Sequence, residues 1–256
     1  MTTVATKDRV GFGNVLAAEW TKAWTVRSTM WTPMVMMVLI TGFAVFVGAT
    51  RSLQPDDTIL GGSLTGAVTA QIAASVFGVL VVSGEFGSGT IRATFAATPR
   101  RGAVLAAKAV VVAVVMFTTA LIGSVVAYQI GTEMLTGEGY ASGDAFPAVL
   151  GIAVCCAAVG LLGLALGAVL RHSAAAITTM IGVLLLPSLF GPLFGDLQRW
   201  VAGASPMAAL EKLTQTSDAS PDTVGSLGAW PSLSLVCVYS ATALVLTAWL
   251  VRRRDT

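Results

Sequence analysis

The side chains that most often perform chemistry in proteins are scarce in this sequence. It contains one histidine, His172, which directly follows Arg171. It has neither the HExxH pattern of zinc proteases nor a pair of CxxC motifs, and its carboxylates form no cluster, so we predict no metal site. A lone histidine beside an arginine more often has a structural than a catalytic role, and we predict no catalytic residue.

A glycine-rich run at residues 84–90, GEFGSGT, has some likeness to a phosphate-binding loop. A P-loop requires GxxxxGK followed by Ser or Thr, because the lysine contacts the bound phosphates. Here Gly89 is followed directly by Thr90, so the lysine is missing. The run also joins two apolar stretches and not a strand and a helix. We therefore predict that this chain itself binds no nucleotide and no other cofactor.

Six apolar stretches make up most of the chain, which is 55% apolar and 11% charged, whereas soluble domains carry about 25% charge. Crossing a bilayer takes about 20 apolar residues, and the backbone must be helical because lipid cannot pair its polar groups. We predict an all-α, polytopic membrane protein with one transmembrane domain, residues 1–256. The six spans are expected at residues 31–49, 64–82, 104–130, 147–170, 174–195 and 232–251.

The predicted spans contain almost no ionisable side chain. Lys108 lies near the end of the third span, where its long side chain can snorkel towards the interface. The Asp, Glu or His relay of a proton-driven carrier is missing from the spans, so uphill transport would need another energy source. The three cysteines are interpreted as small packing residues and not as a disulfide framework. They are Cys155, Cys156 and Cys237.

The charged residues are sorted between the two sides of the predicted membrane. With the amino terminus in the cytoplasm, all but three of the 15 Lys and Arg residues lie on the cytoplasmic side, and most acidic residues lie outside. The positive-inside rule therefore predicts that both termini lie in the cytoplasm. We expect the protein itself in the plasma membrane. Thirty residues precede the first span, which is long for a cleaved signal peptide. The three outer basic residues are Arg51, Arg199 and Lys212.

The segment before the first span is expected to lie on the membrane. We predict that residues 1–11 are disordered and that residues 12–29 form an amphipathic helix in the headgroup plane, with Trp20 and Trp24 on its apolar arc. The alternative is a cytoplasmic extension of the first span. The other residues expected on the apolar arc are Phe12, Val15, Leu16 and Ala23.

Two further helices are expected between the spans. The inner loop, residues 84–101, predicts a short helix with Ser88 as its N-cap and with Ile91 and Phe95 on one face. In the outer loop, residues 207–216 predict another short helix. The fourth span carries a stripe of small residues that allows close helix packing, within the chain or against a second copy. The stripe consists of Cys156, Gly160, Gly163 and Gly167.

The inner loop resembles that of the permease subunits of type-2 class ABC exporters, which follow the pattern E-x-x-S-G-T-[IL], then P-x-R, then K. The segment before the first span is similar to their pre-membrane helix, which often reads E-x-x-K. Six spans and a basic tail extend the likeness along almost the whole chain. The matching residues are Glu85, Ser88, Gly89, Thr90, Ile91, Pro99, Arg101, Lys108, Glu19 and Lys22.

The resemblance implies that two permease subunits, identical or homologous, pair above two separate ATPase subunits, which bind ATP and Mg. It also implies that the inner loop carries a coupling helix that docks on the ATPase. An ordinary inner loop would explain the arginines but not the Ser-Gly-Thr sequence. The implied coupling residues are Glu85, Ser88, Gly89, Thr90, Ile91, Arg92, Phe95, Arg100 and Arg101, and those of the interfacial helix are Glu19, Trp20, Lys22 and Trp24.

We therefore expect a transmembrane permease subunit of an ATP-driven exporter, with no enzymatic activity of its own and no nucleic-acid partner. The charge-poor spans favour a lipid-like, peptide or hydrophobic drug substrate. The alternative is a non-transporting membrane sensor or assembly component, which co-purification of a companion ATPase would distinguish. An intramembrane enzyme is disfavoured because His172 lies at the edge of the membrane.

Overall fold

The computed structural model describes residues 11–53, 56–90, 101–137, 139–191, 193, 198–215, 219 and 224–253. Within these ranges the chain is helical, and its one extended pairing is an isolated bridge between Thr58 and Ala141. The helices are α1 (Phe12–Thr25), α2 (Arg27–Thr50), α3 (Ile59–Leu64), α4 (Gly66–Gly87), α6 (Arg101–Leu135), α7 (Ala145–Leu170), α8 (Ser173–Phe190), α9 (Gln198–Gly203), α10 (Pro206–Thr214) and α12 (Ala229–Arg253).

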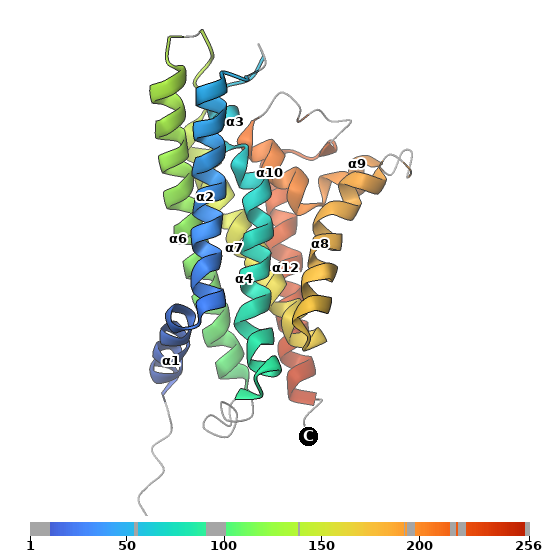
Figure 1. Ribbon diagram of the computed structural model, residues 1–256. Coiled ribbons are helices and arrows are strands. Elements are labelled where there is room, and N and C mark those ends of the chain that lie inside the picture. Colours follow the sequence, from blue (N-terminus) through green and yellow to red (C-terminus); the bar gives the residue numbers. More distant parts are fainter. Residues whose placement is uncertain are drawn as a thin grey trace, which may run out of the picture.

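Six helical segments are long and apolar enough to cross a membrane, and they run side by side in one bundle (Figure 1). The prediction of an all-helical, six-span membrane protein is therefore confirmed. The fifth span is shorter than predicted, since α8 contains Pro187 and ends at Phe190. The six segments are Thr29–Thr50, Ile59–Gly87, Gly102–Leu135, Ala145–Leu170, Ser173–Phe190 and Ala229–Val251.

Helix α7 is the centre of the bundle, and it packs against α4, α6, α8, α10 and α12. Its small-residue stripe faces α4 of the same chain. A Cβ at Gly163 would overlap the carbonyl oxygen of Ser75, and one at Gly167 would lie 3.0 Å from the carbonyl oxygen of Val79. Of the two alternatives for the stripe, the structure shows packing within the chain.

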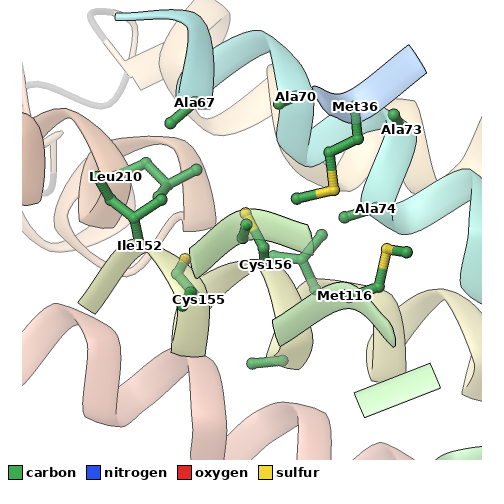
Figure 2. Close-up of a cluster of buried hydrophobic side chains, with 14 of the residues drawn as sticks. Met36, Ala67, Ala70, Ala73, Ala74, Met116, Ile152, Cys155, Cys156 and Leu210 are labelled. Atoms are coloured by element: carbon green, nitrogen blue, oxygen red, sulfur yellow. The ribbon is translucent and has the colours of Figure 1, made fainter. Parts of the chain in front are cut away.

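The core around α7 combines many alanines and several Met and Cys side chains with larger aliphatic residues such as Ile152 and Leu210 (Figure 2). Ala70 and Ala74 of α4 leave room that Met36 of α2 and Met116 of α6 help to fill, because a thioether side chain adapts to irregular gaps. Cys155 and Cys156 are completely buried, and all three cysteines are free thiols. Their predicted role as packing residues is confirmed for these two.

Helix α1 is separate from the first span. Val26 has an extended conformation with ψ 117°, so the helical path is interrupted for one residue between α1 and α2. Helix α1 and the first span are therefore two helices, whereas the location of α1 at the membrane surface stays a prediction. In Figure 1, α1 and the carboxyl terminus lie at the same end of the bundle, which we call the α1 end, whereas α3, α9 and α10 lie at the opposite α10 end.

The α10 end is closed by short helices and paired loops. The Ile59 N–H donates to the Ala141 carbonyl at 2.8 Å, which joins the loop before α3 to the loop before α7. Helix α10 confirms the short helix predicted in the outer loop. The Ser205 side chain caps it, and Leu210 and Leu213 are buried in a helix that contacts α7 and α12.

Candidate functional site

Four charged side chains form a closed ring at the α1 end, which we call the charge ring. Lys108 Nζ lies 2.6 Å from Glu19 Oε2 and 2.8 Å from Glu85 Oε1. Lys22 Nζ lies 2.8 Å from Glu19 Oε1 and 2.9 Å from Glu85 Oε1. Positive and negative groups alternate around the ring, so each charge has two opposite neighbours. The ring joins α1, which supplies Glu19 and Lys22, to α4 and α6.

Helical periodicity places Glu19 in the ring. Val15, Glu19 and Ala23 are four residues apart and are the buried residues of α1, which packs mainly on α6. Val15 meets Val104 and Ala107 in a small apolar cluster next to the ring. Helix α6 has 35 residues, about 52 Å at 1.5 Å per residue, so it is longer than a hydrocarbon core of about 30 Å, and its first turns contact α1.

Lys108 is buried and paired and does not snorkel to the interface, which corrects the expectation from sequence. Its side chain is 2% exposed, and its ammonium group donates to Glu19, to Glu85 and, at 3.2 Å, to the Val81 carbonyl. All three N–H donors are thereby satisfied. Removing one partner of a buried ion pair costs about 3–5 kcal/mol, because the remaining charge is left uncompensated.

Glu85 lies in the last turn of α4 and holds both lysines with one oxygen. Its Oε1 accepts from Lys22 and from Lys108, whereas its buried Oε2 has no hydrogen-bond partner among the described residues. Position 85 is three residues before Ser88, the C-cap of α4. The charge ring therefore lies at the base of the inner loop.

Lys22 is the most exposed member of the ring, with 41% of its side chain accessible. Partial burial lowers the pKa of Lys22, but hydrogen bonds and charge interactions with Glu19 and Glu85 outweigh that effect, so its pKa lies above the usual value. Lys22 therefore stays protonated at neutral pH, and it keeps its opposite charge to both carboxylates.

The start of the inner loop differs from the predicted N-cap arrangement. Ser88 ends α4 as its C-cap, and its hydroxyl donates to the Gly84 carbonyl at 2.8 Å. Gly89 follows with φ +72°, a left-handed conformation that glycine adopts without strain. Thr90 is the last described residue of this segment. The predicted coupling residues Ile91, Arg92, Phe95 and Arg100 lie outside the described residues, as does the side chain of Arg101.

The predicted apolar arc of α1 is divided between two faces. Val15 and Ala23 are buried in the helix that packs on α6, whereas Phe12, Trp20 and Trp24 are exposed. The two indole rings meet edge to face, with centroids 6.1 Å apart. An exposed aromatic pair at this end of the bundle fits the membrane surface, and its location there stays a prediction.

His172 has a structural position. Its Nδ1 accepts a hydrogen bond from the Ala175 N–H at 3.2 Å and thereby caps the start of α8. The guanidinium of Arg171 lies 5.3 Å from the centre of the Phe86 ring, at the end of α4. Within the described ranges, no three His, Cys, Asp or Glu side chains are close enough to share a metal ion.

The ring itself is what sequence reasoning missed. The sequence pattern places Glu19 and Lys22 in the interfacial helix, Glu85 in the inner loop and Lys108 in the loop pattern, with no partner for the charge of Lys108. Lys108 is the one signal in the sequence that points to the ring, because an isolated lysine close to an apolar span needs an opposite charge nearby. Two carboxylates, at positions 19 and 85, were expected on the same side of the membrane.

The fold defines a class, the helical multi-pass membrane proteins. The sequence profile of the ABC-2 type transporter family matches residues 11–213, so the chain belongs to this family. It is accordingly a permease component of an ABC transporter, a family that implies an ABC ATPase as partner. A search of curated proteins gave no match.

Proposed function

We propose that this chain is the transmembrane permease subunit of an ATP-driven exporter in the plasma membrane. Two permease subunits, identical or homologous, enclose the substrate path, and two separate ATPase subunits bind ATP and Mg beneath them. The observation that carries the proposal is the family match over residues 11–213, which includes every member of the charge ring.

The proposal assigns the α1 end to the cytoplasm. Lys22, Arg27, Lys108 and Arg171 are described basic residues of this end, and the α12 carboxyl terminus lies there too (Figure 1). The positive-inside rule supports this orientation. Acidic residues occur in the loops and helix termini of the opposite end, at Asp56, Asp57, Glu133, Asp144 and Glu211.

In this proposal, the ATPase docks on the inner loop between α4 and α6. ATP binding draws the two ATPases together, and the loop then pushes on α4 and α6 and switches access to the path between the permeases. Glu85 and Lys108 support this assignment, because their ion pair of 2.8 Å fixes the two ends of the loop to each other. The coupling surface comprises Ser88, Gly89, Thr90, Ile91, Arg92, Phe95, Arg100 and Arg101.

Co-expression with a companion ATPase tests the proposal. A tag on the permease should recover the ATPase, and the complex in lipid vesicles should hydrolyse ATP at a rate different from that of the ATPase alone. If the permease is stable in the membrane but recovers no ATPase, the proposal is wrong and a sensor or assembly role is favoured. Loading the vesicles with labelled lipids, peptides or hydrophobic dyes identifies the substrate class.

A further inference from the structure

Helix α1 is linked to the base of the inner loop by charge. The helix packs on α6 and, to a lesser extent, on α2. Its link to α4 runs through Glu85, which pairs directly with Lys22 and shares Lys108 with Glu19. A displacement of the last turn of α4 therefore acts on two ion pairs at once, because both lysines are bound to the same Glu85 oxygen.

We infer that the charge ring makes α1 a moving part of the coupling device, so that a push on the inner loop passes through Glu85 and Lys108 to α1. This inference rests on the proposed function. Glu19 and Lys108 are 3% and 2% exposed, so water does not screen their 2.6 Å contact, and the link is stiff. Val26, the one non-helical residue between α1 and α2, serves as the hinge.

A purely static attachment would not require four charges. Replacement of a buried ion pair by well-packed apolar residues is often neutral or stabilising, so a buried ring contributes defined positions more than stability. Val15, Val104 and Ala107 already hold α1 on α6 by apolar packing. The ring adds a direct connection from α1 to the helix turn that leads into the loop. The charged side chains are thus positioning residues for the coupling step.

A fluorescent reporter on α1 tests the inference in the permease–ATPase complex. Ala17 is exposed on α1, so the single-cysteine variant Ala17→Cys, with the three native cysteines changed to Ala, takes an environment-sensitive thiol dye. In lipid nanodiscs, addition of ATP with vanadate should change the dye fluorescence. Lys108→Met should reduce this change about tenfold, while ATPase binding and ATP hydrolysis persist.

Matched variants separate a relay from a loss of fold. Arg27→Gln removes a charge at the same end of the bundle outside the ring, and it should leave the fluorescence change intact. Reversal of all four charges keeps their alternation and should restore the change. If Lys108→Met does not assemble, Lys22→Gln removes a half-exposed partner and tests the same link.

Three results would decide against the inference. It is overturned if ATP produces no fluorescence change although the intact complex hydrolyses ATP. It is also overturned if folded ring variants retain the full change, or if the four-fold reversal assembles and hydrolyses ATP without restoring it. Failure of the unmodified permease to bind any ATPase is a different result, because that would refute the proposed function.

Discussion

Gly78 of α4 lies directly against Gly160 of α7, so closely that a Cβ at position 78 would overlap the carbonyl oxygen of Gly160. Both residues are in helices, and backbone cannot yield in the way that a flexible side chain can. The contact therefore sets the distance between the central helix and α4, the helix that ends at the charge ring. Small residues at helix contacts in membranes allow such close approach.

Gly78→Ala should destabilise the protein by about 1–3 kcal/mol, the usual cost of overpacking, because α4 and α7 must separate to admit the methyl group. Thermal unfolding in detergent measures the change. Gly84→Ala is the matched control, since it lies on the same helix with no atom within 4 Å of the added Cβ. Equal melting temperatures for the two variants would contradict the packing described here.

Lys108→Met should destabilise the protein by about 3–5 kcal/mol, because Glu19 and Glu85 would then share only Lys22. Adding Glu19→Gln should recover part of the loss, since the double variant removes one charge of each sign. Denaturant unfolding of the two single variants and of the double variant gives the coupling energy. Strictly additive effects would show that the two side chains do not interact.

Thiol labelling from outside the cell tests the orientation. Ser88 and Ser142 are both exposed and lie at opposite ends of the bundle. With Cys237 changed to Ala, Ser142→Cys should react with a membrane-impermeant reagent, and Ser88→Cys should react only after the membrane is opened. Cys155 and Cys156 should not react with the reagent because they are buried. The opposite labelling pattern would show that the protein has the reverse orientation in the membrane.

The double variant Ile91→Asp with Phe95→Asp should release the ATPase or uncouple its hydrolysis from transport, while the permease still inserts. The two apolar side chains are four residues apart on the predicted coupling helix, and burial of one Phe in a partner is worth about 2–3 kcal/mol. Co-purification and vesicle assays measure both effects. Arg92→Ala should act more weakly, because a charge at the rim of an interface contributes little. Full binding and transport in the double variant would disprove the coupling assignment.

Trp20→Asp with Trp24→Asp should reduce recovery of the assembled complex and leave the six spans inserted, because carboxylates do not replace indole rings at the boundary between headgroups and acyl chains. Both tryptophans are exposed on α1, as membrane anchors must be. Thr21→Asp with Thr25→Asp puts the same charges on other exposed positions of that helix and should be tolerated. Similar recovery of both double variants in detergent would argue against an anchoring role.

The number of spans and the class of the protein are determined by the sequence alone. A segment of about 20 apolar residues in lipid must be helical, whatever packs around it, so composition is sufficient to predict the element. The short outer helix was also predictable, because Ser205 and Pro206 are local signals for a helix start. The family pattern in the inner loop can likewise be recognised from the sequence, because its residues are close together in the chain.

Only the tertiary structure decided which charges meet and which face of α1 is buried. Glu19 and Lys108 are 89 positions apart and come together because α1 packs on the first turns of α6. Amphipathic periodicity places Val15 on the arc of the tryptophans, but the packing on α6 buries Val15 and Ala23 and leaves the two indoles exposed. Local helix propensity cannot predict such contacts. They depend on how far each helix is rotated and shifted along its axis, and this is decided by the packing of the helices against one another.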